Sequence, residues 1–291
     1  MLAHALFGGI VYGCYFALLG LGLNLVFGVM RIVNLAHGDL VMLGAMAAYF
    51  LFHLAGLSPL AAAPLVAIAF FLLGLPLYAG LIPRLLAARE AEMLSFTLFF
   101  GVQQIIEALA AILFGPSERS LPARSLAAGP FVLFGQSVPK AWALSALIAA
   151  LALALFYLYL HHTRLGLLTR AVMASPEEAA ASGIDLYRVS AIAFGVGVAL
   201  AGLAGVFAPF MLGSVTPSMG ASLNLVAFAT VVVGSLGAPL GTILGGLVYG
   251  IGLLLMQTYF STWADLLPDL LLIAILLFRP SGLLGRRVRL A

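Results

Sequence analysis

Charged residues are almost absent from long parts of this chain. Residues 189–264 contain no Asp, Glu, Lys or Arg, and residues 1–83 contain only Arg31 and Asp39 among these types. Over the 291 residues, 64% are hydrophobic and 8% are charged, whereas about 25% of residues in soluble domains are charged. Such a sequence has too few polar side chains to cover a water-soluble fold. We therefore expect a protein that crosses a membrane several times.

The apolar residues form continuous runs, which indicates membrane helices. A helix needs about 20 apolar residues to cross a bilayer, whereas the strands of a membrane β-barrel alternate apolar and polar residues. The runs predict an all-α, polytopic transmembrane helical bundle with about 8–9 spans. The expected spans are residues 5–29, 35–55, 60–82, 93–114, 141–160, 189–211, 221–236, 240–259 and 266–279.

We expect residues 1–291 to form a single transmembrane domain, with a cytoplasmic loop at about residues 161–188. Residues 115–140 hold several Gly and Pro residues and predict a loop with little room for helix. The segments LGSVTPSMG (212–220) and GSLGAPLG (234–241) interrupt apolar runs at or inside the membrane. Irregular backbone survives at that depth only where it is buried in protein or lines a wet cavity.

The positions of Lys and Arg predict the orientation. If nine spans cross and the loop 161–188 is cytoplasmic, ten of the 13 basic residues lie on the cytoplasmic side, as the positive-inside rule requires. Those ten are Arg31, Arg84, Arg89, Arg164, Arg170, Arg188, Arg279, Arg286, Arg287 and Arg289, and the other side holds Arg119, Arg124 and Lys140. The N-terminus is then outside, and the first span acts as the insertion signal. A first pair of segments that did not cross fully would move the N-terminus and give eight spans.

Several functions lack their usual residues. The basic residues lie between spans, so topology explains the net charge of +3, and we expect no nucleic acid partner. The single cysteine, Cys14, excludes an intrachain disulfide and a Cys-rich metal site. A P-loop requires a Gly-Lys pair, and the only lysine, Lys140, follows a proline. We expect no catalytic residue, no metal and no cofactor in this chain.

A short helix is predicted inside the loop 161–188. Ser175 is a good N-cap, Pro176 suits the first helical position, and Glu178 completes an S-x-x-E capping box. Gly183 is a natural stop, because glycine adopts the left-handed conformation easily. A helix of about two turns is not stable alone in water. It is therefore either an ordinary interfacial helix or one whose alanine face fits a groove of another chain.

Polar residues inside the apolar runs are candidates for a translocation path. In NLAHGD, Asn34 either caps a helix at the interface, with His37 and Asp39 in a wet first turn, or the turn lines the path or its gate. One His and one Asp are too few ligands for a metal site. Glu107 is either a cavity residue or a hydrogen-bonded packing residue. The candidates are Asn24, Asn34, His37, Gly38, Asp39 and Glu107.

Four stretches resemble the permease subunits of branched-chain amino-acid ABC importers, of the LivH type. They are GLNLVFGVMRIVNLAHGDLVMLGA (22–45), TRLGLLTRAVMASPEEAAASGID (163–185), VVVGSLGAPLGTILGGLVYG (231–250) and AILLFRPSGLLGR (274–286). The resemblance covers essentially the whole chain. It implies an ABC importer permease fold, in which the loop carries the coupling helix that docks in a cleft of an ATPase subunit. The implied coupling residues are Arg170, Ala171, Ser175, Pro176, Glu177, Glu178, Ala179, Ala180, Gly183 and Ile184.

The resemblance also implies a set of partners in the bacterial inner (plasma) membrane. These are a second related permease subunit (LivM type), two ATP-binding cassette subunits that use ATP and magnesium, and a periplasmic or extracellular substrate-binding protein, with membrane lipid around the spans. The implied substrates are leucine, isoleucine and valine. Another amino acid or a small amide such as urea is an alternative, because selectivity in the family resides largely in the binding protein.

Two other classes of function stay open from the residues alone. An ion-coupled secondary transporter would use Asp39, His37 and Glu107 as coupling groups, and its transport would follow an ion gradient without ATP. A structural or channel-like membrane subunit would show passive conductance that the loop helix does not influence.

Overall fold

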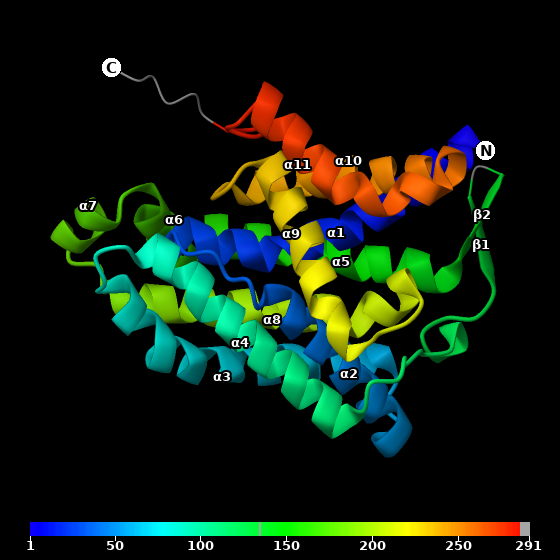
Figure 1. The fold of residues 1–291 in the computed structure, drawn as a ribbon, viewed down its shortest axis with the longest axis horizontal. Helices are drawn as coiled ribbons and strands as arrows, with labels where there is room; N and C mark the ends of the chain where they lie inside the picture. Colours follow the sequence, from blue (N-terminus) through cyan, green and yellow to red (C-terminus); the bar gives the residue numbers. More distant parts are fainter. Residues whose placement is uncertain (134, 286–291) are drawn as a thin grey trace.

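A computed structural model describes residues 1–133 and 135–285 of the chain (Figure 1). In this part, nine helices are long and apolar enough to cross a membrane, so the predicted all-α membrane bundle is confirmed. Each predicted span overlaps one of them. They are α1 (Leu2–Met30), α2 (His37–Ala55), α3 (Pro59–Leu86), α4 (Ala91–Phe114), α5 (Lys140–His162), α8 (Leu186–Leu212), α9 (Gly220–Gly234), α10 (Pro239–Tyr259) and α11 (Leu267–Phe278). Short 3-10 turns, η2 (Pro217–Met219) and η3 (Ser261–Leu266), precede α9 and α11.

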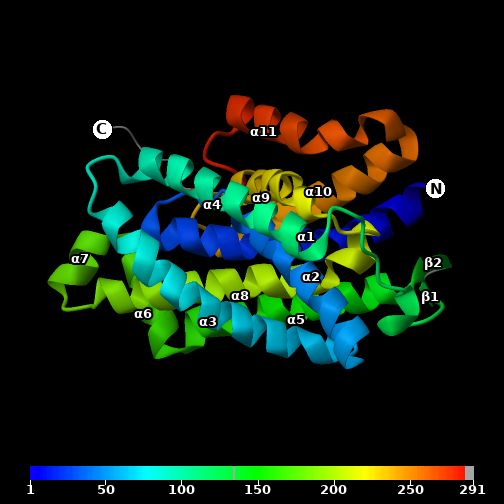
Figure 2. The same cartoon turned by 60° about the horizontal axis from the view of Figure 1, so that its bottom comes forward.

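Helix α1 lies at the centre of the bundle. It packs against α5, α8, α9 and α10 (Figures 1 and 2). Small residues allow this close packing. A Cβ atom on Gly246 of α10 would lie 2.5 Å from the backbone nitrogen of Ala17 in α1, while Gly245 faces the backbone of Thr230 in α9. Gly246 therefore lets α10 approach α1 closely, and Gly245 lets it approach α9.

The connection after α4 contains more structure than a loop. A short 3-10 turn, η1 (Ala123–Ser125), is followed by the hairpin of β1 (Pro130–Leu133) and β2 (Gln136–Pro139), in which Phe131 faces Val138. Backbone hydrogen bonds between Arg119 and Val215, of 2.9 and 2.8 Å, tie this connection to the segment after α8. The local sequence could not predict this pairing, because Val215 is distant from Arg119 along the chain.

The loop 161–188 contains two helices instead of one. Helix α6 (Arg164–Ala174) precedes the predicted helix, α7 (Pro176–Ala181). Helix α6 begins after Thr163, whose hydroxyl accepts a hydrogen bond from the backbone N–H of Gly166 at 2.9 Å. Figures 1 and 2 place α7 and the β1–β2 hairpin at opposite ends of the bundle.

The segment after α11 folds back onto α9. The N–H groups of Leu283 and Leu284 donate to the carbonyl oxygens of Val233 and Gly234, at 2.9 and 3.3 Å. They satisfy carbonyls that the end of a helix leaves free. Arg286, Arg287 and Arg289, which the predicted orientation places on the cytoplasmic side, lie outside the described residues.

Candidate functional site

The NLAHGD turn lies deep inside the bundle. Helix α1 ends at Met30, and α2 begins at His37. The Nε2 atom of His37 lies 2.9 Å from the carbonyl oxygen of Leu19. At 1.5 Å per residue, Leu19 is about 16 Å before the end of α1, which is about half the thickness of a bilayer's hydrocarbon core. The chain therefore runs back toward the middle of the bundle before α2 starts.

Burial tests one of the two interpretations of this turn, the one with a wet first turn. The exposed fractions of Asn34, His37 and Asp39 are 1%, 1% and 0%. The side chain of Asn34 accepts a hydrogen bond from the backbone N–H of Ala36 at 3.1 Å, and the N-cap of α2 is Ala36. The alternative of an Asn34 cap beside a wet first turn is therefore wrong.

Two helix N-termini meet at Asp39. The carboxylate lies in the first turn of α2 and packs against Gly220, the first residue of α9. Gly38 beside it packs on α9 as well, since a Cβ there would lie 2.5 Å from the backbone nitrogen of Asn224. Helix N-termini stabilise a nearby negative charge, which gives a physical reason for a buried carboxylate at this depth.

Polar atoms at this point lack partners. Neither carboxylate oxygen of Asp39 nor the Oδ1 atom of Asn224 has a hydrogen-bond partner within the described part of the chain. Unpaired buried polar groups are costly, and inside a membrane they commonly mark a pathway. We name His37, Gly38, Asp39, Gly220 and Asn224 the polar junction. Asn224 was missed from the sequence, although it is the only carboxamide in the run 221–236.

Asn24 holds the turn between α9 and α10. Its Nδ2 group has two N–H donors and lies 3.2 and 3.0 Å from the carbonyl oxygens of Ser235 and Ala238, and within reach of the Oγ1 atom of Thr242, so two of these acceptors share one N–H. Its Oδ1 atom accepts a hydrogen bond from the backbone N–H of Gly237 at 2.6 Å. The amide of Asn24 is thus fully used within the protein, and it stabilises the backbone of an interruption predicted at or inside the membrane.

Glu107 lies on a helix that contacts both helices of the polar junction, α2 and α9. It is half-buried on α4, a helix that packs against α2, α3, α9 and η2. Gln103, one turn earlier, is buried with 7% of its surface exposed.

Helix α7 has the predicted ends. The Oγ atom of Ser175 accepts from the N–H of Glu178 at 3.3 Å. The second half of the capping box is replaced, because the N–H of Ser175 donates to Ala171 in the preceding helix. At the other end, Gly183 has φ of +81° and Ile184 donates to the carbonyl oxygen of Ala179 at 3.1 Å. This is the Schellman arrangement of a helix end.

One face of α7 packs against neighbouring helices, and the other face is exposed. Ala179 is 4% exposed, and α7 contacts α6 and α8. The remaining predicted residues of the helix lie largely at the surface: Pro176, Glu177, Glu178 and Ala180 are exposed, as are Gly183 at its end and Arg170 on α6. Helix α7 thus presents a short, negatively charged surface at one end of the bundle.

The sequence has relatives among known transport proteins. The profile of the family described as "Branched-chain amino acid transport system / permease component" matches residues 5–276. The permease protein LivH of Escherichia coli (strain K12) is 27% identical, with 97% of this chain and 94% of LivH covered. BraD of Pseudomonas aeruginosa is 28% identical over 97% and 95%, and a probable LivH of Methanocaldococcus jannaschii is 28% identical over 96% and 91%. No solved structure matches the chain.

The family match and the bundle of candidate spans agree with each other and with the motif resemblance. The chain therefore belongs to the family of permease components of branched-chain amino acid transport systems, and it is a multi-pass membrane subunit for transport rather than an enzyme.

Proposed function

We propose that the chain is the permease subunit of an ATP-driven importer of leucine, isoleucine and valine in the bacterial inner (plasma) membrane. Two ATP-binding cassette subunits use ATP and magnesium, a second permease of the LivM type completes the path, and a periplasmic or extracellular binding protein delivers the substrate. The names of the relatives support the substrate. The observation that carries the coupling is the open, capped helix α7 at one end of the bundle.

Helix α7 is proposed to dock on an ATPase subunit. The coupling residues are those of the loop: Arg170, Ala171, Ser175, Pro176, Glu177, Glu178, Ala179, Ala180, Gly183 and Ile184. Closure of the ATPase subunits then moves α7, provided that the ATPase dimer binds the two states of the permease with different free energies.

Helix α8 connects α7 with the polar junction. Four residues, 182–185, separate it from α7, and Asp185 is its N-cap. Farther along α8, Gly197 packs against Gly22 of α1, and a Cβ on Gly22 would also lie 3.0 Å from Cε1 of His37. A shift of α8 along its axis therefore acts on the packing beside His37.

The polar junction and the neighbouring Asn34 are proposed to form the gate of the path. His37, Gly38 and Asp39 lie on its α2 side, with Asn34 just before α2, and Gly220 and Asn224 lie on its α9 side. The two helix N-termini that meet at Asp39 support this proposal, since transporters commonly place half-helix ends at mid-membrane ion and solute sites. Asn24 and Glu107 act beside the gate, Asn24 by fixing the turn before α10 and Glu107 on the neighbouring α4.

The unpaired carboxylate of Asp39 also favours the ion-coupled alternative. Uptake into proteoliposomes that hold the complete complex separates the two. With binding protein and ATP but no ion gradient, we expect leucine uptake that stops when ATP is omitted. Uptake that requires a proton or sodium gradient and ignores ATP would contradict the proposal. Labelled urea in place of leucine tests the alternative substrate class in the same vesicles.

A further inference from the structure

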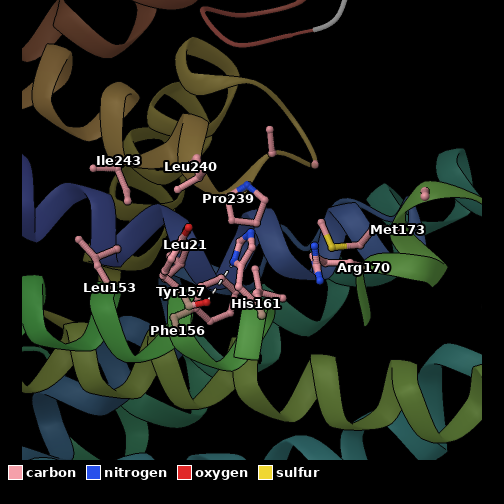
Figure 3. A pocket seen from close by; sticks show the side chains of 14 residues that line it. Leu21, Leu153, Phe156, Tyr157, His161, Arg170, Met173, Pro239, Leu240 and Ile243 are labelled. Carbon is pink, nitrogen blue, oxygen red and sulfur yellow. Dashed lines mark hydrogen bonds between the residues drawn. The ribbon is translucent and has the colours of Figure 1, made fainter. Parts of the chain in front are cut away.

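A cavity of about 370 Å³ lies between α1, α5, α6 and the start of α10. Figure 3 shows Arg170 and Met173 from α6 at one end, and Leu153 and Ile243 at the other. Most of the lining is apolar, with Leu21, Phe156 and Leu240 among its residues. The cavity therefore combines an apolar interior with one basic end.

The basic end lacks an acidic partner. Among the described residues, no Asp or Glu lines the cavity. Within residues 1–133 and 135–285, the ion pair that forms joins Arg188 to Asp185, so Arg170 has no carboxylate partner there. His161 also lines the cavity, and its Nδ1 atom lies 3.1 Å from the carbonyl oxygen of Tyr157. The guanidinium of Arg170 is free to bind an anion.

The position in the bundle favours a lipid as the occupant. His161 is in the last turn of α5, a membrane span, so the cavity lies where the span ends. A phospholipid at that level puts its phosphate beside the ends of the helices and its acyl chains beside the apolar residues. Basic pockets between transmembrane helices bind anionic headgroups.

We propose that this cavity binds an anionic phospholipid, with its phosphate on Arg170 and an acyl chain along Leu21, Leu153 and Ile243. The bound lipid also contacts Met173 and Gly237, which belong to α6 and to the turn that Asn24 fixes. It therefore joins the loop helices to the α9–α10 turn. This inference is independent of which solute the chain transports.

The test is lipid retention on the purified full chain, measured by native mass spectrometry. Phosphatidylglycerol and phosphatidylcholine with identical acyl chains are added in turn. We expect preferential retention of one phosphatidylglycerol molecule. Arg170→Gln reduces this retention by about five-fold, the effect of one basic residue beside an anionic headgroup. Arg164→Gln, which removes the same charge from α6 outside the cavity, leaves it unchanged.

Filling the cavity tests its apolar part. Ile243→Trp is expected to reduce retention of both lipids, whereas Leu244→Trp, at an exposed neighbouring position outside the lining, does not. Folding is checked by size-exclusion elution of each variant. Unchanged phosphatidylglycerol retention in both folded Arg170→Gln and folded Ile243→Trp would overturn the proposal. Displacement of the lipid by inorganic phosphate at equal concentration would overturn it too, because it would identify a simple anion site.

Discussion

Asn24 supplies hydrogen-bond partners for backbone groups of the turn between α9 and α10. This turn, of residues 235–238, joins two membrane helices, and Asn24 bonds to its backbone at three residues. One amide bonds four atoms of this turn and of Thr242, while Ser235 holds a φ of +126° that a non-glycine residue rarely adopts. The turn thus depends on a residue more than two hundred positions away in the sequence.

Asn24→Ala is expected to lower the free energy of unfolding by about 1–3 kcal/mol, because it leaves buried polar groups unpaired. The measurement is thermal unfolding in mild detergent. Gln104→Ala, which removes an exposed amide from α4, is the matched control and should shift stability little. Equal stability of Asn24→Ala and the wild type would show that the turn does not need the amide.

The proposed gate is tested most directly by a substitution of Asp39. Asp39→Asn keeps the shape of the side chain and removes the ionisable carboxyl group at the starts of α2 and α9. We expect ATP-driven uptake to fall by roughly two- to thirty-fold, the range for residues that modulate coupling, without loss of folded protein. Glu118→Gln, an exposed carboxylate in the loop after α4, controls for net charge. Near-normal uptake by Asp39→Asn would contradict the role of Asp39 in the gate and would leave it a role in packing alone.

At the scale of elements, α7 depends on its glycine end. Gly183 has φ of +81°, and apart from its chain neighbours no atom of the described residues lies within 4 Å of the place where its Cβ would be. A substitution there acts through backbone conformation alone. Gly183→Val is expected to disturb the end of α7 and to reduce ATP-coupled uptake, whereas Gly183→Asn retains more of it, because Asn tolerates the left-handed region. Equal uptake by the two variants would contradict the docking role of α7.

The α1–α10 contact depends on close backbone approach. Gly246→Leu would force the two helices apart, and overpacking of this kind costs about 1–3 kcal/mol or more. Gly80→Leu on α3, where the Cβ would meet no atom within 4 Å, is the control. We expect a lower unfolding temperature in detergent for Gly246→Leu alone. A similar temperature for both variants would mean that α10 is not held by this contact.

At the scale of the whole molecule, the orientation follows from the positions of α7 and the hairpin at opposite ends of the bundle. Together with the basic residues between spans, this predicts a cytoplasmic α7 and a hairpin on the outer side. In a Cys14→Ala background, Ser182→Cys should react with a membrane-impermeant maleimide only in inside-out vesicles. Ser137→Cys should react only in intact cells. Labelling of both from the same side would contradict nine crossings.

The sequence was sufficient where structure depends on local patterns. Nine apolar runs predicted nine helices, and the cap at Ser175 with the stop at Gly183 predicted α7. Thr163 could have revealed α6 by the same capping logic. The depth of His37 could not be predicted, because it follows from a contact with Leu19 after the chain runs back along α1. The meeting of Asp39 with Gly220, and of Asn24 with the 235–238 turn, likewise depends on tertiary packing.

The most direct test of ATPase coupling is affinity purification of the tagged chain from its native membranes, followed by mass spectrometry. We predict stoichiometric ATP-binding subunits and a second permease with the wild-type chain. With Ala180→Arg, on the exposed face of α7, the second permease should remain while the ATP-binding subunits are lost. A wild-type chain that purifies without ATP-binding subunits would contradict the proposed function, as would an Ala180→Arg chain that keeps them in full.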